Sequence, residues 1–191
     1  MNRAEGIIYQ TVYESPIGEL TLTALDDTLA AVSFPRERYP QDVERLIKGR
    51  EVCTPDTDKY PRILVDTVYW LDIYFSGKKP DFTPALAPQG SEFRKMVWEE
   101  LLKISYGCTV TYGQIAKEIA ARKGIARMSA QAVGGAVGHN PIGIIIPCHR
   151  VVGTGGNLTG FGGGMQAKKA LLKLEGVDMG QFYVPKKGTA L

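Results

Sequence analysis

The sequence predicts an α+β protein in two parts: a small N-terminal antiparallel sheet domain with helices, and a mainly helical C-terminal domain that contains a helix-turn-helix. Three observations predict this division. Short β-rich segments joined by turn residues occupy positions 7–34. Helical spacing of apolar residues dominates from position 92 onward. A segment with three prolines lies between them, so we expect domains over 1–80 and 91–191 with a linker over 81–90.

The first domain has the sequence pattern of an antiparallel meander. We expect strands over 7–13, 20–23 and 29–34, with turns between them. The spacing of apolar residues predicts a short helix over 42–48 and an amphipathic helix over 63–75, and the polar segment 49–61 between them is expected to be a loop. The domain holds no cluster of reactive side chains, so we expect it to support the second domain.

Charge is divided unevenly along the chain. Residues 1–89 carry ten Lys and Arg against fourteen Asp and Glu, a net of −4, whereas residues 90–191 carry thirteen against six, a net of +7. A basic second half is typical of a protein with a polyanionic partner such as nucleic acid. Charge alone leaves open the alternative that these basic residues are scattered over a solvated surface.

The second domain is expected to begin with three helices. They are predicted over 92–104, 112–121 and 130–138, with Ser91, Thr111 and Ser129 as N-caps. The last two, separated by a break at Gly124, have the outline of a helix-turn-helix. The last helix contains three glycines, each of which costs up to about 1 kcal/mol relative to alanine. Close approach to another surface would explain them, and so would tight helix–helix packing.

A cysteine lies in the most unusual stretch of the chain, residues 144–152. Isoleucines lead into Pro147-Cys148-His149-Arg150, and two valines follow, so we expect a buried strand that carries reactive groups. A cysteine acts as a nucleophile only as its thiolate, and His149 and Arg150 could supply the positive charge that favours that form. Neighbouring side chains on a strand point to opposite faces, so an inert buried thiol remains an alternative at this point.

Several other functions are excluded or disfavoured by composition. The chain has two histidines and no cysteine pair with the spacing of a zinc site, so we expect no metal and no cofactor. Its three cysteines are an odd number without disulfide spacing, and no apolar run is long enough to span a membrane. The N-terminal residues lack the pattern of a signal peptide. We therefore expect a cytoplasmic protein.

The active-site signature of one family matches this stretch. Pro147-Cys148-His149-Arg150-Val151 resembles the signature of the O6-alkylguanine-DNA alkyltransferases. Further segments fall in the order of that family: Ser15-Pro16-Ile17-Gly18, Leu20-Thr21-Leu22, Phe93 with Val97-Trp98, Thr111-Tyr112-Gly113, Ala132-Val133-Gly134-Gly135-Ala136, Asn140-Pro141, and Leu171-Leu172 before Glu175-Gly176. The resemblance therefore covers nearly the whole chain.

The resemblance implies direct-reversal DNA repair. A methylated-DNA–protein-cysteine methyltransferase of this kind moves an alkyl group irreversibly from O6-alkylguanine in DNA to Cys148, once per molecule, with O4-alkylthymine as a further candidate substrate. The protein would be a monomer that binds the minor groove of double-stranded DNA and flips the damaged nucleotide into a pocket. A glycine-rich loop over 153–164 would close over the flipped base.

The resemblance also implies a role for individual residues. Glu175 would orient His149, which would deprotonate Cys148 through a water, while Tyr112 would donate a proton to the guanine ring and Asn140 would brace the turn. The implied substrate-binding residues are Tyr112, Cys148, Val151, Phe161 and Gly162. The implied DNA-binding residues are Ala130, Gln131, Ala132, Gly134, Gly135 and Thr154.

Three departures from the family pattern bear on these expectations. Gln131 stands where many members carry an arginine finger, Phe161 stands where a tyrosine is common, and the connection over 121–128 is longer than in the shortest members. None removes the nucleophile. The alternatives are a non-catalytic sensor of alkylated DNA, as in relatives that lack the cysteine, and a Cys-His hydrolase or acyl transferase, which would turn over many times.

Overall fold

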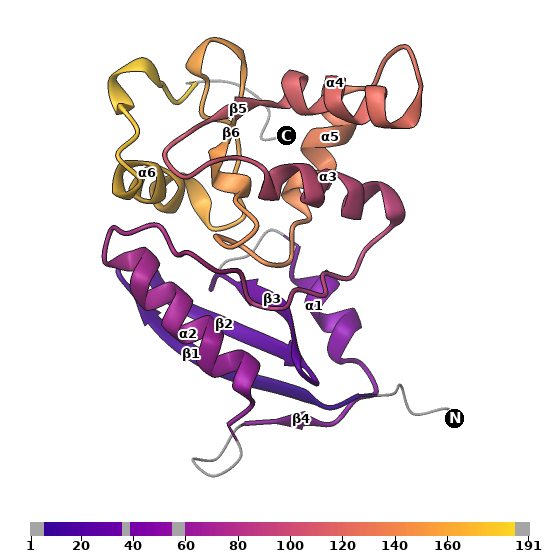
Figure 1. Ribbon diagram of the computed structural model, residues 1–191, viewed down its shortest axis with the longest axis vertical. Coiled ribbons are helices and arrows are strands. Elements are labelled where there is room, and N and C mark those ends of the chain that lie inside the picture. Colours follow the sequence, from indigo (N-terminus) through magenta and orange to yellow (C-terminus); the bar gives the residue numbers. More distant parts are fainter. Residues whose placement is uncertain (1–5, 36–38, 55–59, 186–191) are drawn as a thin grey trace. The chain divides into compact units, whose positions relative to one another are not determined.

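The computed structural model describes residues 6–35, 39–54 and 60–185 (Figure 1). Contacts within the chain divide it into two compact units. The first comprises Met1–Gln89 together with Pro141–Gly143, and the second comprises Gly90–Asn140 with Ile144–Leu191. Within the described ranges, no helix has both the length and the apolar character that crossing a membrane requires.

The first unit is built on a four-stranded sheet in the order β3-β2-β1-β4 (Figure 1). Strands β1 (Ile8–Ser15), β2 (Gly18–Leu25) and β3 (Thr28–Ser33) pair antiparallel, which confirms the predicted meander. The fourth strand, β4 (Val52–Cys53), pairs parallel with β1 inside the segment predicted to be a loop, so that prediction was wrong there. Two residues are too few to show a strand periodicity. Residues 55–59 of the predicted loop lie outside the described residues.

Two helices complete the first unit. Helix α1 (Pro40–Ile47) packs Leu46 against Ile8 and Ala30 of the sheet, and α2 (Arg62–Phe75) contacts β1, β2 and β3. The proline-rich segment predicted as a linker is bonded to this unit. Leu29 of β3 donates its N–H to Ala85 O (2.8 Å) and accepts from Ala87 N (2.9 Å).

Four helices form most of the second unit: α3 (Glu92–Leu102), α4 (Tyr112–Lys123), α5 (Ala130–Gly138) and α6 (Gly164–Leu174). The caps predicted for the first three are present, since Ser91, Thr111 and Ser129 each accept a hydrogen bond from a backbone N–H in the first turn. Helices α3, α4 and α5 contact one another, and the Trp98 indole N–H donates to Ala136 O at 2.9 Å. The predicted helix-turn-helix, α4 and α5, therefore packs against α3.

The predicted buried strand before Cys148 is wrong. Ile144 adopts a left-handed backbone with φ of 70°, and Cys148–Arg150 form a 3₁₀ helix, η1. Strand β6 covers only Val151–Val152 and pairs in parallel with β5 (Val110–Thr111). A short run of buried apolar residues does not by itself specify a strand, and Pro147 cannot donate a hydrogen bond to a neighbouring strand.

The segments after β6 have more structure than the sequence predicts. The glycine-rich loop contains a short 3₁₀ turn, η2 (Thr154–Gly156). The segment after α6 includes η3 (Met179–Gln181), and Met179 and Phe182 pack against a cluster of Val152, Leu158, Leu172 and Val177. These contacts cover the end of α6, after which Glu175 lies.

Candidate active site

Cys148, His149 and Arg150 are buried together on η1. Their exposed fractions are 8%, 0% and 8%. A 3₁₀ helix has about three residues per turn, so consecutive side chains diverge by about 120° instead of pointing to opposite faces as on a strand. The local geometry therefore removes the objection that adjacent Cys148 and His149 cannot serve one site.

Asn140 holds the cysteine from the end of α5. Its Nδ2 donates to Ile146 O at 2.8 Å and to Cys148 Sγ at 3.1 Å. A donor directed at sulfur stabilises the thiolate more than the thiol, because the negative charge strengthens the bond. The amide thus joins the segment after α5 to the segment that leads into η1.

Glu175 is the centre of the buried polar network. Its Oε1 lies 2.6 Å from His149 Nε2 and 3.0 Å from Arg150 Nη2, and its Oε2 accepts from Arg150 Nε at 2.8 Å. An ionised carboxylate can only accept, so His149 carries its proton on Nε2 and keeps Nδ1 as the basic nitrogen. The backbone N–H of Gly107 also donates to Oε2, at 3.0 Å.

The network sets the charge of its two titratable members. Burial alone would raise the pKa of Glu175, but the hydrogen bonds and charges of His149 and Arg150 outweigh it and lower that pKa to about 2. Burial lowers the pKa of His149 below its ordinary value, although Glu175 acts in the opposite direction. At neutral pH the imidazole is therefore neutral and the carboxylate is charged, which is the state a general base requires.

Tyr112, at the start of α4, is also buried. The Thr159 hydroxyl donates to its phenol oxygen at 3.2 Å. Burial raises the pKa of Tyr112, the hydrogen bond from Thr159 lowers it, and the charge of Cys148 raises it, with a net increase. The phenol is therefore protonated at neutral pH and can act as a proton donor.

Lys168 of α6 belongs to this region and was missed by the sequence reasoning. Its side chain is fully buried, and Nζ donates to Val151 O (2.6 Å) and Thr159 O (2.9 Å). Burial lowers its pKa to about 8. The sequence does carry a signal, because Lys168 lies three and four residues before Leu171 and Leu172, a spacing that places it on the apolar face of a helix.

The glycine-rich loop contributes an aromatic ring and open backbone. Phe161 meets the His149 ring edge-on, with centroids 6.4 Å apart and an interplanar angle of 80°. Gly162 is half-buried, with open space where a Cβ would lie, and Thr154 is exposed. Val151 O, predicted to read the substrate, accepts from Lys168, and a carbonyl has a second lone pair for another donor.

The residues of α5 that are predicted to contact DNA lie on two sides of the helix. Ala130, Gln131 and Ala132 are exposed, and Gly135 is half-buried with open space where a side chain would begin. Gly134 differs, because it lies on the buried side of the helix with Val133 and Val137. The contact expected between Gly134 and DNA stays a prediction.

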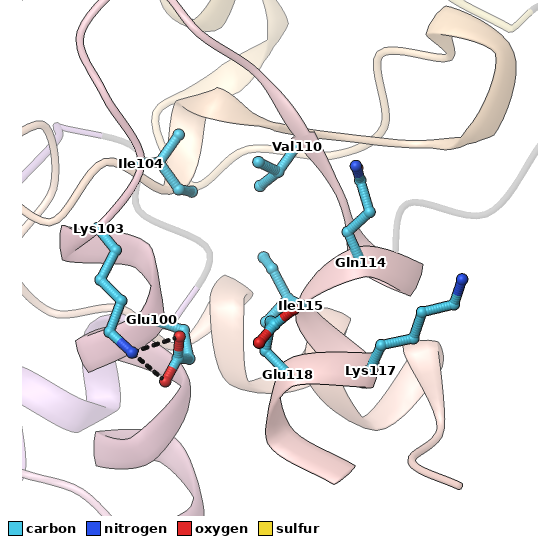
Figure 2. Close-up of a pocket in the computed structure, with 8 residues that line it drawn as sticks. All are labelled: Glu100, Lys103, Ile104, Val110, Gln114, Ile115, Lys117 and Glu118. Carbon is cyan, nitrogen blue, oxygen red and sulfur yellow. Dashed lines mark hydrogen bonds and ion pairs between the residues drawn. The ribbon is translucent and has the colours of Figure 1, made fainter. Parts of the chain in front are cut away.

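A surface cavity of about 390 Å³ lies elsewhere, where the end of α3 faces α4 (Figure 2). Its lining includes Ile104, Val110 and Gln114 together with Glu100 and Lys103, which form an ion pair at 2.7 Å. It contains none of the predicted site residues. Among the described residues, no group of His, Cys, Asp and Glu is arranged to hold a metal ion.

Comparison with known proteins gives consistent matches over both units. Residues 8–88 match the ribonuclease-like domain of 6-O-methylguanine DNA methyltransferase, and residues 92–177 match the DNA binding domain of the same family. The chain is 52% identical to the methylated-DNA–protein-cysteine methyltransferase of Methanosarcina mazei, over 88% of this chain and 97% of the relative. It is 43% identical to that of Mycobacterium tuberculosis, over 88% and 92%.

A solved structure agrees with these matches. The crystal structure of Mycobacterium tuberculosis OGT in complex with DNA is similar to this chain with a TM-score of 0.70 and 36% sequence identity, and covers 91% of this chain and 94% of the solved one. The α+β fold with a helical DNA-binding domain is thereby confirmed. The chain belongs to the family of the methylated-DNA–protein-cysteine methyltransferases, also called O6-alkylguanine-DNA alkyltransferases.

Proposed function

We propose that Cys148 is the methyl acceptor and that His149, Glu175, Tyr112 and Asn140 serve its reaction. As a member of its family, the chain is a DNA-repair protein that transfers a methyl group from O6-methylguanine to one of its own cysteines. One observation favours Cys148 over the other two thiols. Asn140 donates to its sulfur, and the next residue is hydrogen-bonded to Glu175. Cys108 is exposed, and Cys53 lies in the other unit.

The first step is loss of the thiol proton. Neutral His149 is held by Glu175 through Nε2, so Nδ1 is its basic nitrogen, and we propose that a water carries the proton from Cys148 to it. The positive imidazolium that results is stabilised by the buried carboxylate of Glu175. The hydrogen bond from Asn140 stabilises the thiolate at the same time.

The second step is displacement at carbon. The Cys148 thiolate attacks the methyl carbon of O6-methylguanine, an S–C bond forms, and the C–O6 bond breaks with its electron pair remaining on the guanine. A ring nitrogen then takes a proton from the Tyr112 phenol, which the imidazolium can replace through solvent. The products are S-methylcysteine and unmodified guanine. The thioether cannot be displaced again by a similar route, so each molecule reacts once.

Recognition of the damaged base is assigned to the surroundings of η1. We propose that carbonyls of Cys148 and Val151 accept from the exocyclic amine of the flipped guanine. Phe161 and Gly162 would cover the base, and the edge-on contact of Phe161 with His149 supports this position for the loop. Reading a base in this way requires that it leave the DNA stack.

DNA binding is assigned to the exposed side of α5. We propose that Ala130, Ala132 and Gly135 allow this helix to lie close in the minor groove of double-stranded DNA, with Thr154 against the neighbouring DNA strand. Gln131 would enter the space left by the flipped nucleotide. Its amide can hydrogen-bond the orphaned base but lacks the charge of an arginine. We expect the protein to act as a cytoplasmic monomer on alkylated guanine in general, with O4-alkylthymine as a candidate substrate.

The direct test is the mass of the protein after reaction. Incubation with duplex DNA that contains one O6-methylguanine should add one methyl group per molecule, and peptide mapping should place it on Cys148. The Cys148→Ala variant should show no gain, whereas the control Cys108→Ala should react as the wild type does. Lesion-selective binding without any gain in mass would favour the sensor, and many product molecules per protein would favour a hydrolase. A methyl group on Cys53 or Cys108 would contradict the assignment.

A further inference from the structure

The turn between α3 and β5, residues 104–107, is bonded to the network around Glu175 at several points. Ile104 O accepts from Arg150 Nη1 at 2.6 Å, and the Arg150 guanidinium lies 5.7 Å from the centre of the Tyr106 ring. The Tyr106 hydroxyl donates to Leu174 O at 3.4 Å, and Gly107 N donates to Glu175 Oε2 at 3.0 Å. Almost seventy residues of sequence separate this turn from Glu175, so the contacts are purely tertiary.

Gly107 meets two separate requirements for glycine. Its φ of 75° lies in the left-handed region that L side chains rarely adopt. A Cβ at this position would also lie 2.9 Å from the backbone oxygen of Glu175, closer than real Cβ contacts occur. Gly124 provides a contrast, because its φ of 62° is also left-handed but nothing lies within 4 Å of its Cβ position. The close approach to Glu175 is therefore specific to Gly107.

This approach helps to fix where the carboxylate points. Arg150 binds both oxygens, with Nε at Oε2 and Nη2 at Oε1, and Gly107 N also binds Oε2, while Oε1 faces His149 Nε2. The Arg150 side chain can move together with the carboxylate, whereas a backbone N–H on a tight turn cannot rotate away, so Gly107 anchors the carboxylate to the backbone. Outer partners of this kind orient the groups that act directly on the substrate.

We propose that Gly107, assisted by Tyr106, is a positioning residue that sets the basicity of His149 through Glu175. The proposal rests on the roles assigned above to Cys148, His149 and Glu175. Other charged and titratable groups also face this pair: Arg150 on η1 acts on both residues, Lys168 on α6 acts on His149, and Tyr106 on the turn itself interacts with Glu175. Cys148 acts on Lys168. Displacing the carboxylate removes the anion that stabilises protonated His149, so the Cys148 thiolate would form only at higher pH.

The experiment measures thiolate formation without DNA. Iodoacetamide alkylates thiolates, so the rate of Cys148 modification, followed by intact mass and peptide mapping over a pH series, reports the pH at which the thiolate forms. In Gly107→Ala we expect the midpoint to rise by about one pH unit, with about tenfold slower modification at neutral pH. Gly124→Ala carries similar backbone strain and should keep the wild-type midpoint. A small-molecule thiol, N-acetylcysteine, measured over the same pH series is the reference for an unperturbed thiol.

Each outcome bears on one of the two proposals. A Gly107→Ala rate that is lower at every pH with an unchanged midpoint would show a merely structural role and overturn the positioning proposal. If Gly107→Ala does not fold, Tyr106→Ala should raise the midpoint. Tyr106→Phe, which keeps the ring beside Arg150, should not raise it. An unchanged midpoint in Tyr106→Ala would also overturn the positioning proposal. If wild-type Cys148 titrates like N-acetylcysteine, the failure lies with the base assigned to Cys148.

Discussion

The two units bury different kinds of polar groups. In the described part of the first unit the buried polar side chains are Thr23 and Thr67, which are neutral hydroxyls. The described part of the second unit buries five: Asn140, His149, Arg150, Lys168 and Glu175. Four of these five are ionisable. They meet around the segment 148–151, with two on η1, Lys168 on α6 and Glu175 directly after α6, while Asn140 reaches Cys148 from the segment after α5.

This difference indicates that the buried polar groups of the first unit serve only its fold, whereas those of the second unit also serve its reaction. Burying a charge costs several kcal/mol unless partners compensate, so a chain selected for stability alone would be expected to use apolar side chains of similar size. The second unit instead satisfies its buried charges with one another and with backbone carbonyls. Local folding rules are broken mainly where function requires it.

Among the variants that test this comparison, Glu175→Gln is expected to change the free energy of unfolding most. Neutralising the carboxylate leaves the Arg150 guanidinium buried without its counter-ion, which should lower the free energy of unfolding by about 3–5 kcal/mol. The matched control is Glu99→Gln, whose partner Arg122 lies at 2.6 Å on the surface, with expected losses below about 1 kcal/mol. Urea unfolding of both variants measures the difference.

The same two variants also test how stability changes in acidic solution. The pKa of Glu175 in the folded protein, about 2, lies below its ordinary value of 4.5. The unfolded chain therefore takes up this proton first, and stability that is present above pH 4.5 is lost as the pH falls toward 2. This loss should be smaller in Glu175→Gln than in Glu99→Gln. Equal acid sensitivity would mean that the network is not held by an ionised carboxylate.

A smaller effect, again a stability that rises with pH, is expected from Lys168 in alkaline solution. Its pKa of about 8 in the folded protein lies below the ordinary 10.5, so between these values the unfolded chain holds a proton that the folded protein has released. Stability attributable to Lys168 should therefore rise with pH in this window, by at most about 1.4 kcal/mol per pH unit. Lys168→Met should lack the rise, and Lys173→Met, at an exposed position of α6, should keep it. Thermal unfolding between about pH 7.5 and about 10 decides this.

The smallest effect is expected in the first unit. The Thr67 hydroxyl donates to Ile63 O at 2.7 Å within α2. A carbonyl inside a helix also accepts a backbone hydrogen bond, so it does not depend on the hydroxyl. Thr67→Val keeps the shape of the side chain and should change the free energy of unfolding by no more than about 1 kcal/mol. Methyl transfer to Cys148 should be unchanged. A slower transfer at equal stability would show that the buried groups of the two units do not differ in function.

Most of the secondary structure in the second unit, and the identity of its unusual residues, could be predicted from the sequence. Ser91, Thr111 and Ser129 marked the helix starts because N-caps act within one turn of the chain. Cys148 and His149 stood out because reactive groups were placed in an apolar run. In each case the physical signal is local, so one stretch of sequence contains it.

How those residues meet could be seen only in the folded chain. It placed Cys148–Arg150 on a 3₁₀ helix, buried Gly134 while leaving Gly135 open, and directed Lys168 at the carbonyls of Val151 and Thr159. It also brought Gly107 against Glu175. These outcomes depend on packing and hydrogen bonds between segments far apart in the chain. Spacing can mark Lys168 as lying on an apolar helix face, but it does not say which distant carbonyls its amine will meet.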